Sequence, residues 1–471
     1  MDYIAFFPRG DRAILDLIDR ALNELVLFTS MFLLAGGIND GAIDLIWICR
    51  SGWRRLFVFS RHPRGSVATL APPRRAGRIA ILVAAWREDA VIGAMLRTAL
   101  GRIAHADYRI YVGVYDNDPA TIAAVAAVAT DDARVRWVGG ACGPTTKGEC
   151  LNRVWRTLVA DEAASGERYK AVVMHDAEDV IHSAELRIFD TLIERFDLVQ
   201  LPVLPIPDPH SHWIAGHYCD EFAEAHHRQL VVREAIGAGV PSAGVGCAIS
   251  RRAMETIAGH RSGHPFDETS LTEDYEIGLR LTALGYDGVF VAMPAHPGGR
   301  IVAVRAHFPS DVDRAIRQKA RWMVGIALAG WDRLGWHPRW AESWMRLRDR
   351  VAPFAALVLF AAYLSLVLWA VSAIGHRLAG TSARPLSPRL ALLLDVNAGF
   401  LLWRIAMRFH SVRHYYGTGE ACLAVVRIVM SNAIAMCAAR RALVDYWRHM
   451  RGRPLQWDKT PHHFPYALPA E

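Results

Sequence analysis

The 471-residue sequence has few cysteines, and none of them forms a recognisable metal-binding pattern. The seven cysteines are scattered, with no CxxC pair and no paired histidine spacing, which excludes a zinc module and is typical of reduced packing residues. The sequence also lacks the spacing of a Walker loop, which excludes an ordinary P-loop ATPase. A cleavable signal peptide is not expected, because four aspartates precede the first apolar run: Asp2, Asp11, Asp16 and Asp19.

Charged residues are scarce for a soluble protein of this length. They make up 21% of the sequence, whereas hydrophobic residues make up 52%, which indicates that part of the chain is buried in lipid. The net charge of +7 does not indicate nucleic-acid binding, because the surplus arginines flank apolar stretches, as the positive-inside rule and anionic headgroups predict. These arginines are Arg50, Arg54, Arg55, Arg61 and Arg64 near the start and Arg440, Arg441, Arg448, Arg451 and Arg453 near the end.

Three apolar segments have the length of transmembrane helices. The first, 22–38, is followed by a basic segment at 50–64 that we expect in the cytoplasm. The second, 353–374, contains no charged residue and is the clearest candidate. The third, 390–407, is interrupted by polar residues. The sequence therefore predicts a multi-pass membrane protein.

A fourth apolar segment, 421–438, has two possible interpretations. It is long enough to span a bilayer, but the central Arg427 would cost roughly 2.5–3.5 kcal/mol on insertion scales. If the segment crossed the membrane, the basic residues from Arg440 onward would lie on the outer side, against the charge bias. We therefore expect an interfacial or re-entrant helix.

Between the apolar segments, short β-rich runs alternate with helical stretches. This alternation predicts an α/β domain with a mostly parallel sheet. The expected strands lie at 79–85, 110–115, 135–139, 171–175, 198–203 and 288–293. The expected organisation is a transmembrane anchor with a basic interfacial segment at 1–65, the α/β domain at 76–340, transmembrane and interfacial helices at 350–440, and a basic cytoplasmic tail at 441–471.

Acidic side chains follow the first two expected strands. Glu88 lies in AAWRED after the first strand, and Asp116 and Asp118 lie in YDNDPAT after the second. In an open parallel sheet, ligands bind at the carboxyl ends of the strands, where such carboxylates can accept hydrogen bonds from a base or a ribose. For Asp118 an alternative is equally good, namely a cap for the helix that begins at Pro119.

A loop of small residues, GPTTKG at 143–148, places Lys147 at the start of an expected helix. A cation at a helix amino end can meet a diphosphate, although a solvated lysine remains the alternative. The segment DAED then crowds Asp176, Glu178 and Asp179 directly after an apolar strand. Such crowding is unfavourable unless a cation compensates it, and carboxylate oxygens suit Mg²⁺ or Mn²⁺. The alternative is an acidic surface turn.

Two further signatures lie on expected helices. LTEDYEIG begins with Thr272 in a capping position and continues with Glu273 and Asp274, either of which can serve as a general base. In QKARW, Gln318, Arg321 and Trp322 are spaced three and four residues apart and so share one side of a helix. Arginine suits diphosphate oxygens and tryptophan suits a sugar face, whereas an amphipathic helix lying on the membrane is the alternative.

Taken together, these motifs resemble the family-2 glycosyltransferases with a GT-A fold, in particular the membrane-bound processive branch that includes bacterial cellulose and hyaluronan synthases. A closer resemblance is to the glycosyltransferase portion of the phage adsorption protein B group. It covers nearly the whole chain, and its motifs are HDAEDV, PSAGVG at 241–246, SRRA at 250–253, LTEDYEIG, RQKARW and WDKTPHHFP at 457–465.

The resemblance implies an inverting transfer of a hexosyl or N-acetylhexosaminyl group from a UDP-sugar to a growing polysaccharide. It places Asp116 near the nucleotide, Asp176 and Glu178 at the metal and diphosphate, and Asp274 as the base. Gln318, Arg321 and Trp322 would hold the diphosphate and the acceptor end. The family's DxD pattern is here Asp176 with the longer Glu178, so Asp179 is an additional candidate for the metal.

Two other functions remain open at this stage. The same chemistry can serve a single transfer to a lipid phosphate, since few membrane helices follow the α/β domain. Alternatively, the chain can be a membrane scaffold or phage-receptor component with a vestigial site. The expected partners are membrane lipid, the donor, the polysaccharide and an outer-membrane export or phage-adsorption component, but not nucleic acid.

Overall fold

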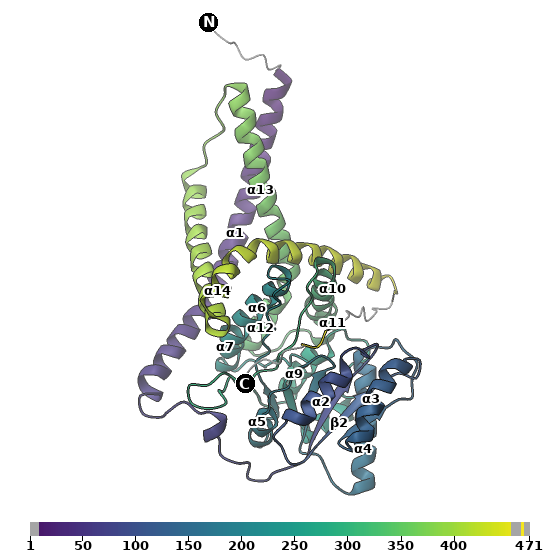
Figure 1. The fold of residues 1–471 in the computed structure, drawn as a ribbon. Helices are drawn as coiled ribbons and strands as arrows, with labels where there is room; N and C mark the ends of the chain where they lie inside the picture. Colours follow the sequence, from purple (N-terminus) through teal and green to yellow (C-terminus); the bar gives the residue numbers. More distant parts are fainter. Residues whose placement is uncertain (1–8, 454–462, 466–471) are drawn as a thin grey trace.

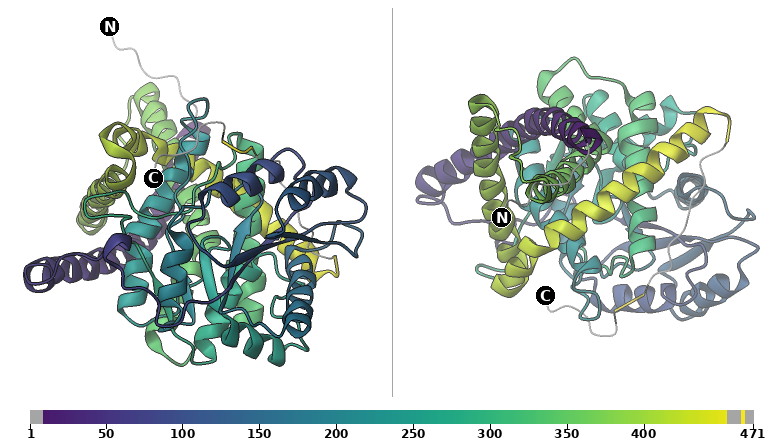
Figure 2. Two further views of the ribbon diagram at one scale, coloured as in Figure 1. Left: turned by 60° about the horizontal axis from the view of Figure 1, so that its bottom comes forward. Right: turned by 90° about the horizontal axis from the view of Figure 1, so that it is seen from above.

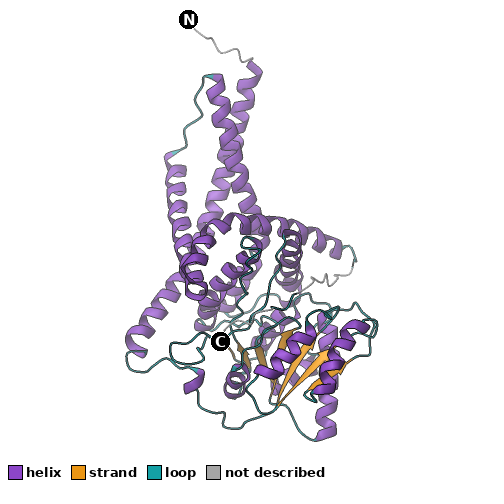
Figure 3. Ribbon diagram, viewed as in Figure 1, coloured by secondary structure: helices purple, strands orange, loops and turns teal. Residues whose placement is uncertain are grey.

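The strands and the long apolar helices occupy separate parts of the computed structural model, which describes residues 9–453 and 463–465. Figure 3 shows the strands gathered at one end of the molecule and the long helices projecting from them. Of the expected basic tail, 454–462 and 466–471 lie outside the described residues, and so does most of the WDKTPHHFP segment. The beginning of that tail, 441–450, is the end of a long helix.

One sheet contains seven strands: β1 (Ile79–Ala84), β2 (Tyr108–Gly113), β3 (Val135–Val138), β4 (Ala171–Asp176), β5 (Leu198–Gln200), β6 (Cys247–Ser250) and β7 (Gly288–Phe290). Their order is β3-β2-β1-β4-β6-β5-β7. β1 is parallel to both β2 and β4, and Ala84 lies opposite both Gly113 and Asp176. The carboxyl ends of these three strands are therefore level, and the segments that follow them meet at one edge.

The predicted α/β architecture is confirmed, but the sequence pattern did not predict β6. This strand is antiparallel to both of its neighbours, β4 and β5. It contains only four residues, too few for a periodic signal, and it follows a loop with two glycines at positive φ, Gly244 and Gly246. β5 is shorter than expected because Pro202, which lacks an N–H donor, follows almost directly.

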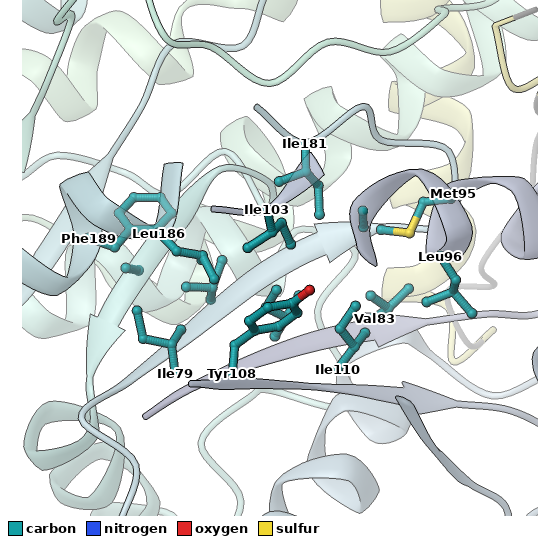
Figure 4. Close-up of a cluster of buried hydrophobic side chains, with 14 of the residues drawn as sticks. Ile79, Val83, Met95, Leu96, Ile103, Tyr108, Ile110, Ile181, Leu186 and Phe189 are labelled. Atoms are coloured by element: carbon teal, nitrogen blue, oxygen red, sulfur yellow. The ribbon is translucent and has the colours of Figure 1, made fainter. Parts of the chain in front are cut away.

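Helices cover both faces of the sheet: α2 (Ile92–Arg102), α3 (Pro119–Asp131), α4 (Lys147–Ser165), α5 (Glu185–Leu192), α8 (Arg251–His260) and α9 (Glu273–Ala283). Within β1, Ile81 and Val83 pack with residues of α2, α3 and α5, whereas Leu82 and Ala84 pack with residues of α4, α8 and α9. Figure 4 shows part of the first layer. Burial on both faces explains the unbroken apolar sequence of β1.

Among the described residues, three helices are long and apolar enough to cross a membrane: α1 (Arg9–Trp53), which continues into the π-helix η1 (Arg54–Val58), α13 (Ala352–Ala379) and α14 (Pro388–Met450). α14 is kinked at Gly417, where φ is 86° and ψ is −179°. Figures 1 and 2 show the part before the kink beside α1 and α13, and the part after it crossing the base of this bundle. The ambiguous segment 421–438 thus runs in a different direction from 390–407.

Shorter helices connect the sheet domain with this bundle (Figure 1). They are α6 (Ile214–Glu224), the π-helix η3 (Ala225–Gln229), α7 (Leu230–Ala235), α10 (Val312–Met323), the π-helix η4 (Val324–Leu328), α11 (Ala329–Leu334) and α12 (Trp340–Arg350), and a 3₁₀ turn, η2 (Val67–Thr69), precedes β1. α14 packs against both α6 and α10. The sheet domain is therefore attached to the apolar helices along several elements.

Arg427 lies in this junction and is only 1% exposed. Its Nε and Nη2 donate to the two carboxylate oxygens of Asp220 in α6 at 2.9 and 2.7 Å, and its Nη1 donates to Glu420 at 2.8 Å. The positive charge of Arg427, which disfavours membrane insertion, is thus compensated by a bidentate pair with Asp220 of α6. This contact fixes the second half of α14 on α6.

The substitution Arg427→Met should detach this part of α14. It leaves the buried carboxylate of Asp220 without its partner, and breaking a buried pair costs about 3–5 kcal/mol. Thermal unfolding in detergent measures the loss. The control is Arg404→Met, because Arg404 is 58% exposed in its pair with Asp40 and should contribute no more than about 1 kcal/mol. Equal unfolding temperatures for the two variants would contradict the assigned role.

Candidate active site

A cavity of about 160 Å³ lies at the carboxyl edge of the sheet. Its wall is built from the ends of β1 and β4, the starts of α4 and α9, the glycine loop before β6, and one side of α10. Ten of the residues that the sequence singled out line it: Glu88, Lys147, Asp176, Glu178, Asp179, Glu273, Asp274, Gln318, Arg321 and Trp322. Signatures separated by more than 200 residues in the chain therefore share one site.

Lys147 is the central cation of this cavity. Its Nζ lies 2.6 Å from Oδ1 of Asp176. Burial lowers the pKa of Lys147, but the negative charges of Asp176, Glu273 and Asp274 outweigh that effect and raise it. The ammonium group is therefore held in its charged form by three carboxylates. The alternative of a solvated surface lysine is wrong.

The carboxylates of the DAED turn have two different roles. Oδ2 of Asp179 accepts from the backbone N–H of Asp176 at 2.9 Å and lies 2.9 Å from Nδ1 of His175. The other nitrogen of His175 lies 2.7 Å from Glu185, which is also buried. Burial lowers the pKa of His175, yet Glu185 and Asp179 raise it to about 10. Asp179 thus fixes the turn, while Asp176 and Glu178 face the cavity.

Asp274 and Glu273 lie on the first turn of α9. Oδ1 of Asp274 accepts from the N–H of Tyr275 at 2.7 Å. Burial raises the pKa of Asp274, although Lys147 opposes this, and burial together with Asp274 raises the pKa of Glu273 to about 8. A carboxylate with a raised pKa is better matched to proton removal than an exposed one.

The glycine loop at 241–246 makes room for the Asp274 carboxylate. Gly244 has φ of +78°, and a Cβ at this position would overlap Oδ2 of Asp274. Only glycine satisfies both conditions without strain. The loop carries part of the family resemblance, but the sequence did not indicate its role, because Gly244 and Asp274 lie 30 positions apart in the chain.

Thr272 occupies the N-cap position of α9, but the expected capping hydrogen bond is absent. Its hydroxyl, which has no hydrogen-bond partner among the described residues, packs against the backbone of Gly325 in η4. A Cβ at Gly325 would lie 2.5 Å from this hydroxyl oxygen. The capping interpretation of Thr272 is therefore wrong, and the residue instead sets a close approach between α9 and η4.

Gln318, Arg321 and Trp322 face the cavity from α10, as their spacing predicts. An adjacent side of α10 holds Lys319, whose Nζ lies 2.6 Å from Glu221 in α6. Glu221 also accepts from Ser431 of α14 at 2.8 Å. α10 is thus fixed to the junction by one face and presents another to the cavity.

Aromatic side chains extend the Trp322 face. The ring centroid of Trp322 lies 6.3 Å from that of Phe222, which in turn lies 4.9 Å from that of Phe308. Phe222 and Phe308 also line the cavity. Such rings can pack against the apolar face of a sugar. Neither phenylalanine belongs to a short motif, so the sequence alone did not indicate them.

Two predicted residues lie outside the cavity lining. Both carboxylate oxygens of Asp118 accept backbone N–H groups, from Arg87 at 2.6 Å and from Thr121 at 3.4 Å. The capping alternative for Asp118 is therefore confirmed. Asp116 is exposed at the end of β2, where its Oδ1 accepts from the N–H of Gly140 at 2.9 Å.

No three His, Cys, Asp or Glu side chains within the described ranges are arranged to hold a metal ion by themselves. This arrangement suits Mg²⁺ or Mn²⁺ bound together with a substrate diphosphate, because such ions are held by one or two carboxylates plus phosphate oxygens. Asp176 and Glu178 supply these two carboxylates. The donor set therefore fits a shared metal site and not a protein-only cage.

Residues 74–325 match the family described as glycosyltransferase-like family 2. The chain belongs to this family. This chain is 35% identical over 470 residues to each of two relatives. They are bacteriophage adsorption protein B of Escherichia coli strain K12 and bacteriophage N4 adsorption protein B of Escherichia coli O157:H7. These alignments cover 94% of this chain and 62% of each relative, so the chain spans less than two thirds of their length. The resemblance inferred from the motifs is confirmed.

The solved structure of the mannosyltransferase PcManGT from Pyrobaculum calidifontis, in complex with GDP-Man and Mn²⁺, has a related fold. The TM-score is 0.54 at 16% identity, and the superposition covers 89% of this chain and 99% of the mannosyltransferase chain. At this identity the likeness establishes the fold alone. It includes most of the helices beyond the sheet domain, because the matched share of this chain exceeds residues 74–325.

Gly244→Ala tests the packing around Asp274. The added methyl group would overlap the carboxylate and adopt an unfavourable φ, so we expect turnover to fall about a hundredfold, as displacement of a catalytic group does. The control is Gly263→Ala, which has φ of +91° but nothing within 4 Å of its Cβ. It imposes the same backbone cost without touching Asp274. If both variants kept full turnover, the loop would not constrain the base.

Proposed function

We propose that this protein is an inverting, membrane-bound glycosyltransferase that transfers a sugar from a nucleoside-diphosphate sugar to a growing polysaccharide on the cytoplasmic face of a bacterial inner membrane. The observation that supports this most directly is the single cavity lined by Asp176, Asp274 and Arg321, which come from β4, α9 and α10. The family membership of residues 74–325 supplies the reaction class.

In this proposal, Lys147 and Arg321 contact the diphosphate of the donor. Both cations line the cavity, and guanidinium groups bind phosphate oxygens in a bidentate manner. Asp116, exposed at the end of β2, meets the nucleotide. We take the donor to be a UDP-sugar. Because the PcManGT structure contains GDP-Man, a GDP-sugar is the main alternative donor.

The proposed metal site consists of Asp176 and Glu178. A bound Mg²⁺ or Mn²⁺ would neutralise the leaving diphosphate. Asp179 remains available only through its second oxygen, since Oδ2 is held by His175 and the N–H of Asp176. Lys147 would then exchange its contact with Asp176 for the diphosphate.

Asp274 is the proposed base. It removes the proton of the acceptor hydroxyl as that oxygen bonds to the anomeric carbon and the nucleoside diphosphate leaves from the opposite face. Glu273 lies beside it on the first turn of α9, and burial together with Asp274 raises its pKa to about 8. Gln318 and Trp322 hold the acceptor end, and Trp322 is continuous with Phe222 and Phe308.

The membrane arrangement follows from the same proposal. α1 runs inward to the arginines at 50–64, α13 runs outward, and α14 returns as far as Gly417. The segment after Gly417 lies along the inner surface, so both arginine clusters are cytoplasmic, in agreement with the positive-inside rule. Activated sugars are then accessible to the cavity. Outer-membrane export or phage-adsorption partners remain part of the proposal because of the related adsorption proteins.

A second candidate function is a single transfer to a lipid phosphate. It is favoured by the small number of apolar helices, since three such helices in the described chain are few for a closed polymer channel. The two functions use the same donor site. They differ in the product, which is a polymer in one case and a monoglycosylated lipid in the other.

Donor turnover tests the proposed function. Purified protein in lipid nanodiscs, incubated with a panel of UDP- and GDP-sugars, should release nucleoside diphosphate with Mn²⁺ or Mg²⁺ and lose this activity on chelation. Mass spectrometry of the products separates polymer from single transfer. Absence of release from every donor, with metal present and membranes supplied as acceptor, would overturn the proposal.

Asp274→Asn should reduce turnover about 10²–10⁴-fold, the range expected for a lost general base, while donor binding measured by calorimetry remains. Asp118→Asn is the matched control, because Asp118 lies outside the cavity and asparagine also caps helices. It should leave turnover unchanged. Full cellular function in an Asp274→Asn strain would instead favour the scaffold role with a vestigial site.

A further inference from the structure

A buried network behind Asp274 connects α9 to α12. Tyr275, the next residue after Asp274, is buried and donates its hydroxyl to Oδ2 of Asp349 at 2.5 Å. Nη1 of Arg233 donates to the same oxygen at 2.7 Å. Asp349 thus receives two hydrogen bonds, one from the helix of the proposed base and one from the end of α7.

The glycine loop that contacts Asp274 is held by the same elements. Nε of Arg233 donates to the carbonyl of Gly239 at 2.6 Å, and the N–H of Gly239 donates to Glu342 of α12 at 2.6 Å. A Cβ at Gly278 of α9 would lie 2.6 Å from the backbone of this loop, so the two segments are in close contact. Both sides of the Asp274 carboxylate are therefore tied to α12.

α12 in turn leads directly into the transmembrane helix α13 and contacts α1. Arg348 of α12 pairs with Asp40 of α1 at 2.9 Å, and Nε1 of Trp344 donates to Asn39 at 2.8 Å. These two contacts lie on the side of α12 that meets α1, whereas Glu342 and Asp349 reach the sheet domain. The helix therefore bridges the bundle and the segments around Asp274.

We propose that Tyr275, Asp349 and Arg233 form a positioning network through which α12 holds the proposed base Asp274 against the glycine loop. This inference rests on the proposed function, since it assigns Asp274 the proton transfer. None of the three residues lines the cavity. Their effect on the reaction is exerted through the backbone of α9.

Tyr275→Phe is the first test, because it removes one hydroxyl and leaves the Asp349–Arg233 pair intact. In nanodiscs, kcat should fall about tenfold while the donor KM stays within about twofold, since misplacing a catalytic group affects the chemical step more than binding. Asp349→Asn should lower kcat by at least as much. The double variant should be no worse than Asp349→Asn alone, because both changes break one linkage.

Asp40→Asn is the matched control. It removes an ion pair of the same helix α12, with Arg348, but on the side facing α1. It should change kcat by less than about twofold, because the Asp40 side chain is 41% exposed, and ion pairs of exposed carboxylates contribute little. An equal fall in kcat for Asp40→Asn and Tyr275→Phe would mean that general loosening of α12 explains the effect, and it would overturn the positioning role.

Hydrogen exchange gives a readout that does not depend on turnover. In Tyr275→Phe, amides at 242–246 and 273–276 should exchange at least threefold faster than in the wild-type protein, whereas β1 amides should be unchanged. Unchanged exchange at both segments overturns the network whether or not any donor is turned over. If the wild-type protein turns over a donor and Tyr275→Phe does so at the same rate, this inference is refuted. The proposed function is then left in place.

Discussion

The concentration of negative charge at one edge of the sheet is the constraint on which the rest of the structure depends. Asp176, Glu273 and Asp274 surround Lys147, burial raises the pKa of both acids on α9, and the charge of Asp274 raises that of Glu273 further. A buried site of this kind is stable only when cations or donors compensate it. The protein supplies one lysine and an arginine from α10, and the proposed divalent metal ion would balance further negative charge.

The position of that site relative to the membrane follows from a second set of buried charges. Arg427 pairs with Asp220, and Glu221 joins Lys319 to Ser431, so α6 and α10 are fixed to the second half of α14. α10 then presents Arg321 and Trp322 to the cavity from another face. The same contacts that attach the sheet domain to the bundle thus orient two elements of the binding site.

Much of this arrangement could be predicted from the sequence. Six of the seven strands follow from short apolar runs, and ten cavity residues follow from the residues at strand ends and from helical spacing, which are local properties. Asp118 and Thr272 show the limit, because a polar side chain at a helix start has either a capping or a ligand role, and only the packed neighbours decide between them. Gly244, Phe222 and Asp349 were not predicted, since their contacts join distant segments.

The central claim is that separated carboxylates act on one activated sugar in one cavity. A structure of the protein in nanodiscs with a nucleoside diphosphate and Mn²⁺ tests this most directly. The account predicts the metal against Asp176 and Glu178, the diphosphate beside Lys147 and Arg321, and open space between that diphosphate and Asp274 for an acceptor. A diphosphate bound elsewhere, or a metal held away from the end of β4, would contradict it.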